Sequence, residues 1–192
     1  MGKGEHTREV ILDEAGGLAA RVGLGGLTIG ELAARTELSK SGLFAHFGSK
    51  ESLQLQVFER TVTRITDVVI RPALRAPRGE PRLRTLVDRW LDWASANGGC
   101  PLLAATFEFD DQPGPLRDRV AAAQNDWIDT LTTVCTTGIA EGHFRPDLDP
   151  RQLAVDIEGV LLAYHVMHRL LADPAARDRA LHSIDALIAA AR

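Results

Sequence analysis

A cluster of small polar and basic side chains, Ser39, Lys40 and Ser41, lies directly before an apolar residue, Leu43. Serine commonly caps the N-terminus of a helix, so the cluster is expected on the first turn of a short helix. Hydroxyl and ammonium groups displayed there can hydrogen-bond to base edges and phosphates in a DNA major groove. Gly42 costs about 1 kcal/mol relative to alanine, which is tolerable where the backbone must approach DNA closely.

A phosphate contact is expected a few residues later. Ser49 is a second candidate cap, and Lys50 follows it at the start of a longer helix. The first N–H groups of a helix have no intrahelical partner, and they carry the positive end of the helix dipole. Together with the lysine ammonium they suit a phosphate oxygen.

Short helices must position these side chains. Helices are expected at about 7–22, 28–35, 39–45 and from 49 to a point before Pro72. Thr28 and Glu31 have the T-x-x-E spacing of a capping box. Ala33, small enough for a close helix crossing, and Leu43, ten residues later, give helix-turn-helix spacing. A helical hairpin in another fold would share these caps and apolar positions, so the spacing alone leaves both interpretations open.

The segment from Leu27 to Leu53, above all SKSGLFAHFGSKESL from Ser39 onward, resembles the DNA-binding signature of the TetR family of transcriptional regulators. The resemblance covers about the first 55 residues. It implies a helix-turn-helix domain at 1–55 and a ligand-binding and dimerisation domain at 56–192. The positions that it implies face DNA are Thr28, Ser39, Lys40, Ser41, Phe44, His46 and Lys50. Those that it implies pack the module are Ile29, Leu32, Ala33, Leu43, Phe47 and Leu53.

Two residues depart from the family pattern. Phe44 stands where tyrosine is common, which keeps the ring but loses a hydroxyl that could donate to a phosphate. Glu37 stands at a turn position usually given to glycine. A left-handed backbone there would cost on the order of 1 kcal/mol for glutamate, and the carboxylate would lie near the groove. Weaker binding or an unusual operator is therefore expected, with the fold unchanged.

The rest of the chain also has helical periodicity, and alternating strand-like patterns are missing, so the fold class is all-α. Further helices are expected at about 82–97, 101–110 and 115–141. Two more are expected to begin at the Asp149-Pro150 and Asp173-Pro174 pairs, each an N-cap residue followed by proline. The proline- and arginine-rich stretch 71–81 is the candidate linker or mobile loop.

The helix expected at 150–172 is apolar on two faces. Leu153 and Ile157 belong to one face, and Val155 and Val166 to the other. One face would serve the subunit core and the other a partner, which with the last helix predicts a homodimer through a four-helix bundle. The resemblance implies the same dimer. Two reading heads roughly 34 Å apart would then match a palindromic double-stranded DNA operator.

An effector pocket is expected among the middle helices, where the larger side chains concentrate. The candidate lining residues are Trp90, Trp93, Phe107, Trp127, Leu131, Tyr164 and His168. Apolar walls with a few polar handles suit a small hydrophobic or aromatic molecule. The alternative for each of these residues is an ordinary core position. The combined expectation is a ligand-responsive regulator, most simply a repressor that the effector releases from its operator.

Composition and missing motifs weigh against other classes. The net charge of −4 argues against a protein that coats nucleic acid non-specifically. Cys100 and Cys135 have no zinc-site spacing, and no signal peptide or membrane-spanning stretch is visible, so a cytoplasmic protein is expected. His165 and His168, one turn apart, could bind a ligand or metal, although backbone or water more often satisfies such histidines.

Catalysis is the least favoured alternative. No phosphate-binding loop, His-Glu-x-x-His or Glu-x-x-His motif occurs, so no catalytic residue, metal or cofactor is assigned. The acidic residues Glu108, Asp110 and Asp111 are expected at a solvated helix end. A helical interaction or sensor protein that has lost DNA affinity remains open, and Phe44 and Glu37 are its best support.

Overall fold

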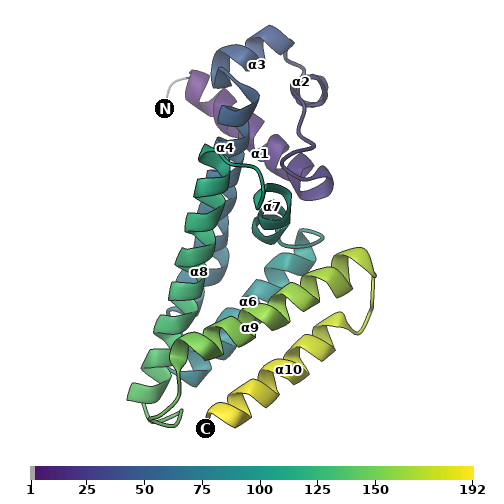
Figure 1. Cartoon of the computed structure of the whole chain (residues 1–192). Helices are drawn as coiled ribbons and strands as arrows, with labels where there is room; N and C mark the ends of the chain where they lie inside the picture. Colours follow the sequence, from purple (N-terminus) through teal and green to yellow (C-terminus); the bar gives the residue numbers. More distant parts are fainter. Residues whose placement is uncertain (1–2) are drawn as a thin grey trace. The chain divides into compact units, whose positions relative to one another are not determined.

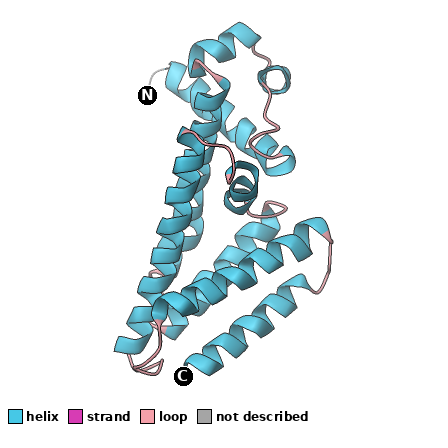
Figure 2. Ribbon diagram, viewed as in Figure 1, coloured by secondary structure: helices cyan, strands magenta, loops and turns pink. Residues whose placement is uncertain are grey.

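The computed structural model describes residues 3–192, and over that range the chain is helical without a strand (Figures 1 and 2). The all-α prediction is therefore confirmed. No helix within those residues is long and apolar enough to cross a membrane. The elements are α1 (Lys3–Val22), α2 (Ile29–Thr36), α3 (Lys40–Phe47), α4 (Lys50–Ile65), the π-helix η1 (Thr66–Ile70), α5 (Arg71–Ala73), α6 (Glu80–Ala96), α7 (Pro101–Phe109), α8 (Pro115–Ala140), α9 (Pro150–His165), the π-helix η2 (Val166–Leu170) and α10 (Ala176–Ala191).

The helices form two compact units that are not simply consecutive in sequence. One unit, the head, comprises Met1–Arg64 together with Pro101–Ala121. The other, the body, comprises Ile65–Cys100 and Ala122–Arg192. Helix α7 and the first turns of α8 thus belong with the N-terminal helices. The domain division at residues 55 and 56 remains a prediction.

Side-chain caps define the short helices of the head, as their sequence predicts. The Oγ1 of Thr28 accepts from the backbone N–H of Glu31 at 3.1 Å, and the Oγ of Ser39 accepts from that of Gly42 at 3.0 Å. Ser49 does the same for Ser52 at 3.0 Å. Each bond satisfies an N–H group that the helix itself leaves unpaired. The apolar core of the head includes Leu18, Leu32, Leu43 and Leu53, all 1% exposed or less.

The turn between α2 and α3 has the strained backbone anticipated from its sequence. Glu37 is left-handed, with φ 56° and ψ 26°, and the next residue, Leu38, donates its N–H to Ala33 O at 3.2 Å. A side chain in this conformation costs energy that glycine does not pay. We expect Glu37→Gly to raise the free energy of unfolding by about 1 kcal/mol in denaturant titrations. An unchanged or lower unfolding midpoint would show that the Glu37 side chain makes a compensating interaction.

Two helix ends differ from a simple reading of the proline positions. Helix α4 ends at Ile65, before Pro72 as predicted, but the π-turn η1 and then α5 continue the helical path, with Pro72 in the first turn of α5. Arg71 there donates its N–H to Thr66 O, and a wider turn of this kind accommodates a residue that cannot donate. The last helix begins at Ala176 rather than at Pro174, because Asp173 Oδ1 caps the N–H of Ala175 and closes a turn first.

The body is built around α6, the later turns of α8, and the antiparallel pair α9 and α10. Helix α9 has the two apolar faces predicted from its periodicity. Its buried face carries Leu153, Ile157 and Leu161, each 4% exposed or less. The other face continues into η2 and leaves an exposed stripe of Val155 (48% exposed), Val166 (40%) and Leu170 (77%).

Candidate nucleic-acid interface and ligand cleft

The residues predicted to face DNA lie on the surface of the head, around the start of α3. Thr28, Ser39, Lys40, Ser41, Phe44 and Lys50 are exposed, and His46 is half-buried. The residues expected to pack the module, by contrast, are buried, except Ile29, which is half-buried. The local helical periodicity therefore separates the two sets much as the resemblance implies. Contact of the first set with DNA stays a prediction.

The first turn of α3 displays both hydroxyl groups and an ammonium group at the surface. Ser39 and Ser41 bring their hydroxyl oxygens within 3.0 Å of each other, and Lys40 lies exposed between them. Because one hydroxyl proton suffices for the bond between the serines, the other can be donated outward. A helix N-terminus with a lysine and a free hydroxyl donor can contact phosphates and base edges.

Phe44 is the anomaly on this surface. It lies one turn after Lys40, and the residue is 53% exposed although its side chain is apolar. Single exposed apolar residues are common on protein surfaces, but this one lies where it is available to a partner bound at the α3 surface. Since the ring has no hydroxyl, it can contribute contact area there but no hydrogen bond.

Lys50 has a role in the head that sequence reasoning missed. Its Nζ donates to the carbonyl of Gly25 at 2.8 Å, and Gln54 Nε2 donates to the carbonyl of Leu24 at 2.7 Å. On the other side, Glu108 Oε2 of α7 accepts from the N–H of Gly25 at 2.8 Å. These bonds fix the turn between α1 and α2. Glu108 thus lies at the half-exposed end of α7, as predicted, but it also holds the Gly25 amide. The Lys50 ammonium has three N–H donors, so its bond to Gly25 leaves two of them for a phosphate.

The body brings together only some of the residues predicted to bind an effector. Tyr164 makes an edge contact with Trp90, with ring centroids 6.0 Å apart, and stacks on His168 at 5.2 Å. Trp93 and Leu131 are buried as well. Phe107 is not with them, because it belongs to the head and is 56% exposed. The concentration of aromatic residues between positions 90 and 168 did not reveal which of them are buried in the body and which, like Phe107, are exposed on the head.

Trp127 reaches a buried carboxylate. Its Nε1 donates to Glu158 Oε2 at 2.8 Å, and Glu158 is 9% exposed. Burial raises the pKa of the Glu158 carboxyl to about 7, while hydrogen bonds from Trp127 and Gln124 act in the opposite direction. The carboxyl can therefore gain or lose a proton near neutral pH. Nothing in the spacing of Trp127 and Glu158 indicates this pair.

The two histidines predicted as ligand or metal candidates have separate environments. His165 Nδ1 accepts the N–H of Cys100 at 3.2 Å, and burial, followed by Arg169 and His168, lowers the pKa of His165. The ring is thus held as a neutral acceptor. No group of three or more potential metal-ligating side chains comes together within the described part of the chain.

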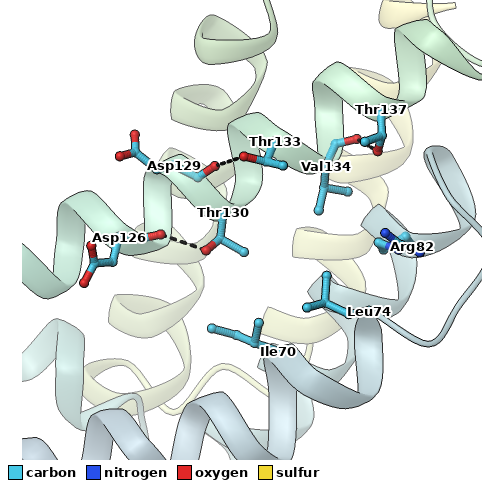
Figure 3. Close-up of a pocket in the computed structure, with 9 residues that line it drawn as sticks. All are labelled: Ile70, Leu74, Arg82, Asp126, Asp129, Thr130, Thr133, Val134 and Thr137. Atoms are coloured by element: carbon cyan, nitrogen blue, oxygen red, sulfur yellow. Dashed lines mark hydrogen bonds between the residues drawn. The ribbon is translucent and has the colours of Figure 1, made fainter.

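A cleft of about 430 Å³ opens in the body, between α8 and the segment that runs from η1 to α6 (Figure 3). None of the predicted effector residues lines it; Tyr164 lines a different cavity of about 260 Å³ between α9 and α10. The cleft residues are Ile70, Leu74, Arg82, Asp126, Asp129, Thr130, Thr133, Val134 and Thr137. Its threonines recur on one face of α8, a signal visible in the sequence but overshadowed by the aromatic residues.

Family models match both parts of the chain. Residues 11–57 match the model described as bacterial regulatory proteins of the tetR family, and residues 79–184 match the tetracycline repressor-like C-terminal domain. None of the curated proteins compared with the chain is significantly similar to it.

Solved structures agree over nearly the whole length. A TetR-family regulator from Cytophaga hutchinsonii is 26% identical, with a TM-score of 0.90 over 100% of this chain and 98% of its own. One from Chloroflexus aurantiacus is 30% identical, with a TM-score of 0.82 over 98% and 96%. AibR, solved in complex with isovaleryl coenzyme A and operator DNA, is 20% identical and shares the fold, with a TM-score of 0.74 over 95% of this chain and 96% of its own.

Proposed function

Because this chain belongs to the TetR family of bacterial regulatory proteins, and is thus a DNA-binding transcriptional regulator with a C-terminal ligand-binding domain, we propose that it is a homodimeric repressor. The dimer occupies a palindromic operator and leaves it when a small molecule binds the body. The observation that carries the proposal is the exposed first turn of α3. There Ser39, Lys40 and Ser41 are exposed to solvent, while the apolar core of the head is buried.

The exposed stripe on α9 and η2 supports a homodimer. Val155, Val166 and Leu170 recur on one helix face, and the neighbouring α10 adds apolar positions at Leu181 and Leu187. An apolar helix pair of this kind stabilises a two-fold four-helix interface. Two heads held about one helical turn of DNA apart, roughly 34 Å, then contact successive major grooves on one side of the duplex.

The continuous helical path from the head into the body offers a route for release. Helix α4 begins at Lys50 in the head and continues without a break through η1 and α5. A ligand that shifts this path alters the spacing of the two heads and lowers operator affinity, and a coupling of a few kcal/mol suffices. The relative solved with both a coenzyme A thioester and operator DNA illustrates such a pair of ligands in one protein.

Selection of bound sites from random duplex DNA by the purified protein tests the proposal. We expect recovery of a palindrome whose half-sites are centred about one helical turn apart. A single unpaired half-site would contradict the dimer, and no enrichment over competitor DNA at low salt would contradict operator recognition altogether. Recovery of a palindrome would fix symmetry and spacing in one experiment.

We further expect Phe44→Tyr to tighten binding to the selected operator roughly fivefold. The new hydroxyl would donate to a phosphate oxygen, and a hydrogen bond to a charged group contributes about 1 kcal/mol or more. Fluorescence anisotropy at fixed salt measures the change. Phe107→Tyr is the matched control, because Phe107 is also an exposed phenylalanine of the head, at 56%, but lies outside the α3 surface. Equal gains for both variants, or none for Phe44→Tyr, would remove Phe44 from the interface.

A further inference from the structure

The α8 cleft has an acidic end, an apolar wall and a basic end. Asp126 and Asp129 lie at one end in Figure 3, and Arg82 lies at the other. Ile70 of η1 and Leu74 just after α5 face Val134 across the middle. Its volume of about 430 Å³ is that of a small-molecule site. The cleft can therefore orient a molecule whose two ends differ in charge.

The threonines of the cleft are acceptors only. Thr130 and Thr133 donate their hydroxyl protons to the carbonyls of Asp126 and Asp129, each at 2.8 Å. Thr137 donates to the carbonyl of Val134 at 2.7 Å. A hydroxyl has one proton, so these bonds leave only the oxygen lone pairs of each hydroxyl for a ligand, beside the threonine methyl groups (Figure 3). The α8 wall is complementary to a ligand that donates hydrogen bonds.

The two aspartates differ in what already neutralises them. Asp129 forms an ion pair with Arg151 at 2.9 Å, whereas Asp126 takes part in no ion pair with any residue that the structure describes. Arg82 is tethered at the opposite end, because its Nε and Nη2 donate to the carbonyl of Ala76 at 3.2 and 3.0 Å. A ligand cation is thus attracted to Asp126 and repelled from Arg82.

We propose that this cleft is the effector site and that the effector is an aliphatic primary amine. Its ammonium group binds Asp126 and the hydroxyl oxygens of α8, and its hydrocarbon chain lies on Ile70, Leu74 and Val134. A primary ammonium has three donors for these acceptors. A quaternary ammonium has none and prefers aromatic faces, and no aromatic side chain lines the cleft. This assignment rests on the proposed function, and it adds the chemical class of the effector that releases the repressor.

The position of the cleft would let its occupant act on the regulator. Ile70 is the last residue of the π-turn η1, and Leu74 follows α5 directly, so both lie on the segment that continues from α4. A π-turn is a point at which a helix changes register readily. A chain seated against Ile70 and Leu74 therefore presses on the element that would transmit release.

Isothermal calorimetry on the full-length protein without DNA tests the ligand class, with n-octylamine, octyltrimethylammonium and octanoate as probes of one chain length. We expect measurable octylamine binding, and at least about tenfold weaker binding of the other two probes. Absence of octylamine binding, or equal binding of the quaternary probe, would overturn the assignment.

Variants locate the site. Asp126→Asn is expected to weaken octylamine binding about tenfold, since it removes a charge-assisted hydrogen bond. Asp118→Asn, an exposed aspartate earlier on α8, is the control. Thr133→Val should weaken binding more than Thr136→Val, because Thr136 makes the same bond to the helix backbone but lies outside the cleft. Equal effects within either pair would place the amine elsewhere.

The outcomes separate this inference from the proposed function. A protein that selects a palindrome but binds no amine keeps its role as a regulator and loses this ligand. A protein that binds octylamine through Asp126 but selects no DNA sequence keeps the site and loses the repressor role. Release of selected DNA by octylamine, abolished in Asp126→Asn, would support both.

Discussion

Raising the pH from about 5 to about 8 should lower the free energy of unfolding of the wild-type protein by about 2.5 kcal/mol more than that of Glu158→Gln. The buried Glu158 carboxyl has its pKa raised from 4.5 to about 7 in the folded state. Between these values the folded protein holds a proton that the unfolded chain releases. The stabilisation is present in full below pH 4.5 and is lost as the pH rises to about 7. Urea titrations at several pH values measure it.

Glutamine is the informative replacement because its amide oxygen can still accept from Trp127 Nε1. Glu14→Gln, an exposed glutamate of α1, controls for loss of a carboxyl. Burial lowers the pKa of His165, which makes stability rise with pH below 6.5, but that contribution is common to all variants and cancels in the difference. Parallel pH profiles for wild type and Glu158→Gln would mean that the carboxyl is solvated in solution.

The second large effect is expected at the exposed apolar stripe. If the protein is the homodimer that we propose, Val155→Arg should convert it to monomers and weaken operator binding at least about 100-fold. A buried arginine without a partner is costly at an interface, and loss of the linked second head removes its high effective concentration. Analytical ultracentrifugation and anisotropy on the selected operator measure the two consequences.

Val68→Arg provides a matched control for this charge. Val68 is 45% exposed, close to the 48% of Val155, but it lies on η1 rather than on α9 or α10. We expect it to leave the dimer and its operator affinity within about twofold of wild type. A Val155→Arg protein that remains dimeric would move the subunit interface away from α9.

The features that could be predicted from the sequence are those that depend on residues close together in the chain. Caps such as Thr28, Ser39 and Asp149 act within three residues of themselves, so their residue type predicts where helices begin. The left-handed backbone at Glu37 could likewise be anticipated, because the surrounding motif resembles one with glycine at this turn position. The α9 faces follow from spacing within one helix.

The features that escaped prediction depend on segments distant in the chain. Glu108 meets Gly25 across 83 positions, and Trp127 meets Glu158 across 31. No periodicity within one helix indicates such partners. The cleft escaped for the same reason, since its apolar wall and its threonines come from separate helices. The continuation of the helical path through Pro72 also escaped prediction, because a proline ordinarily ends a helix and the preceding π-turn lacks a sequence signature.

The bond from Glu108 to the turn after α1 has a consequence for chimaeric regulators. In a chimaera that takes only the helices up to α4 from this protein, the Gly25 amide would lack its carboxylate acceptor, because Glu108 lies on α7 and would not be included. Exchange of sensing parts between relatives should therefore succeed more often when residues 101–121 travel with the N-terminal helices. The unit that can be exchanged as a whole therefore consists of two separate segments of the sequence.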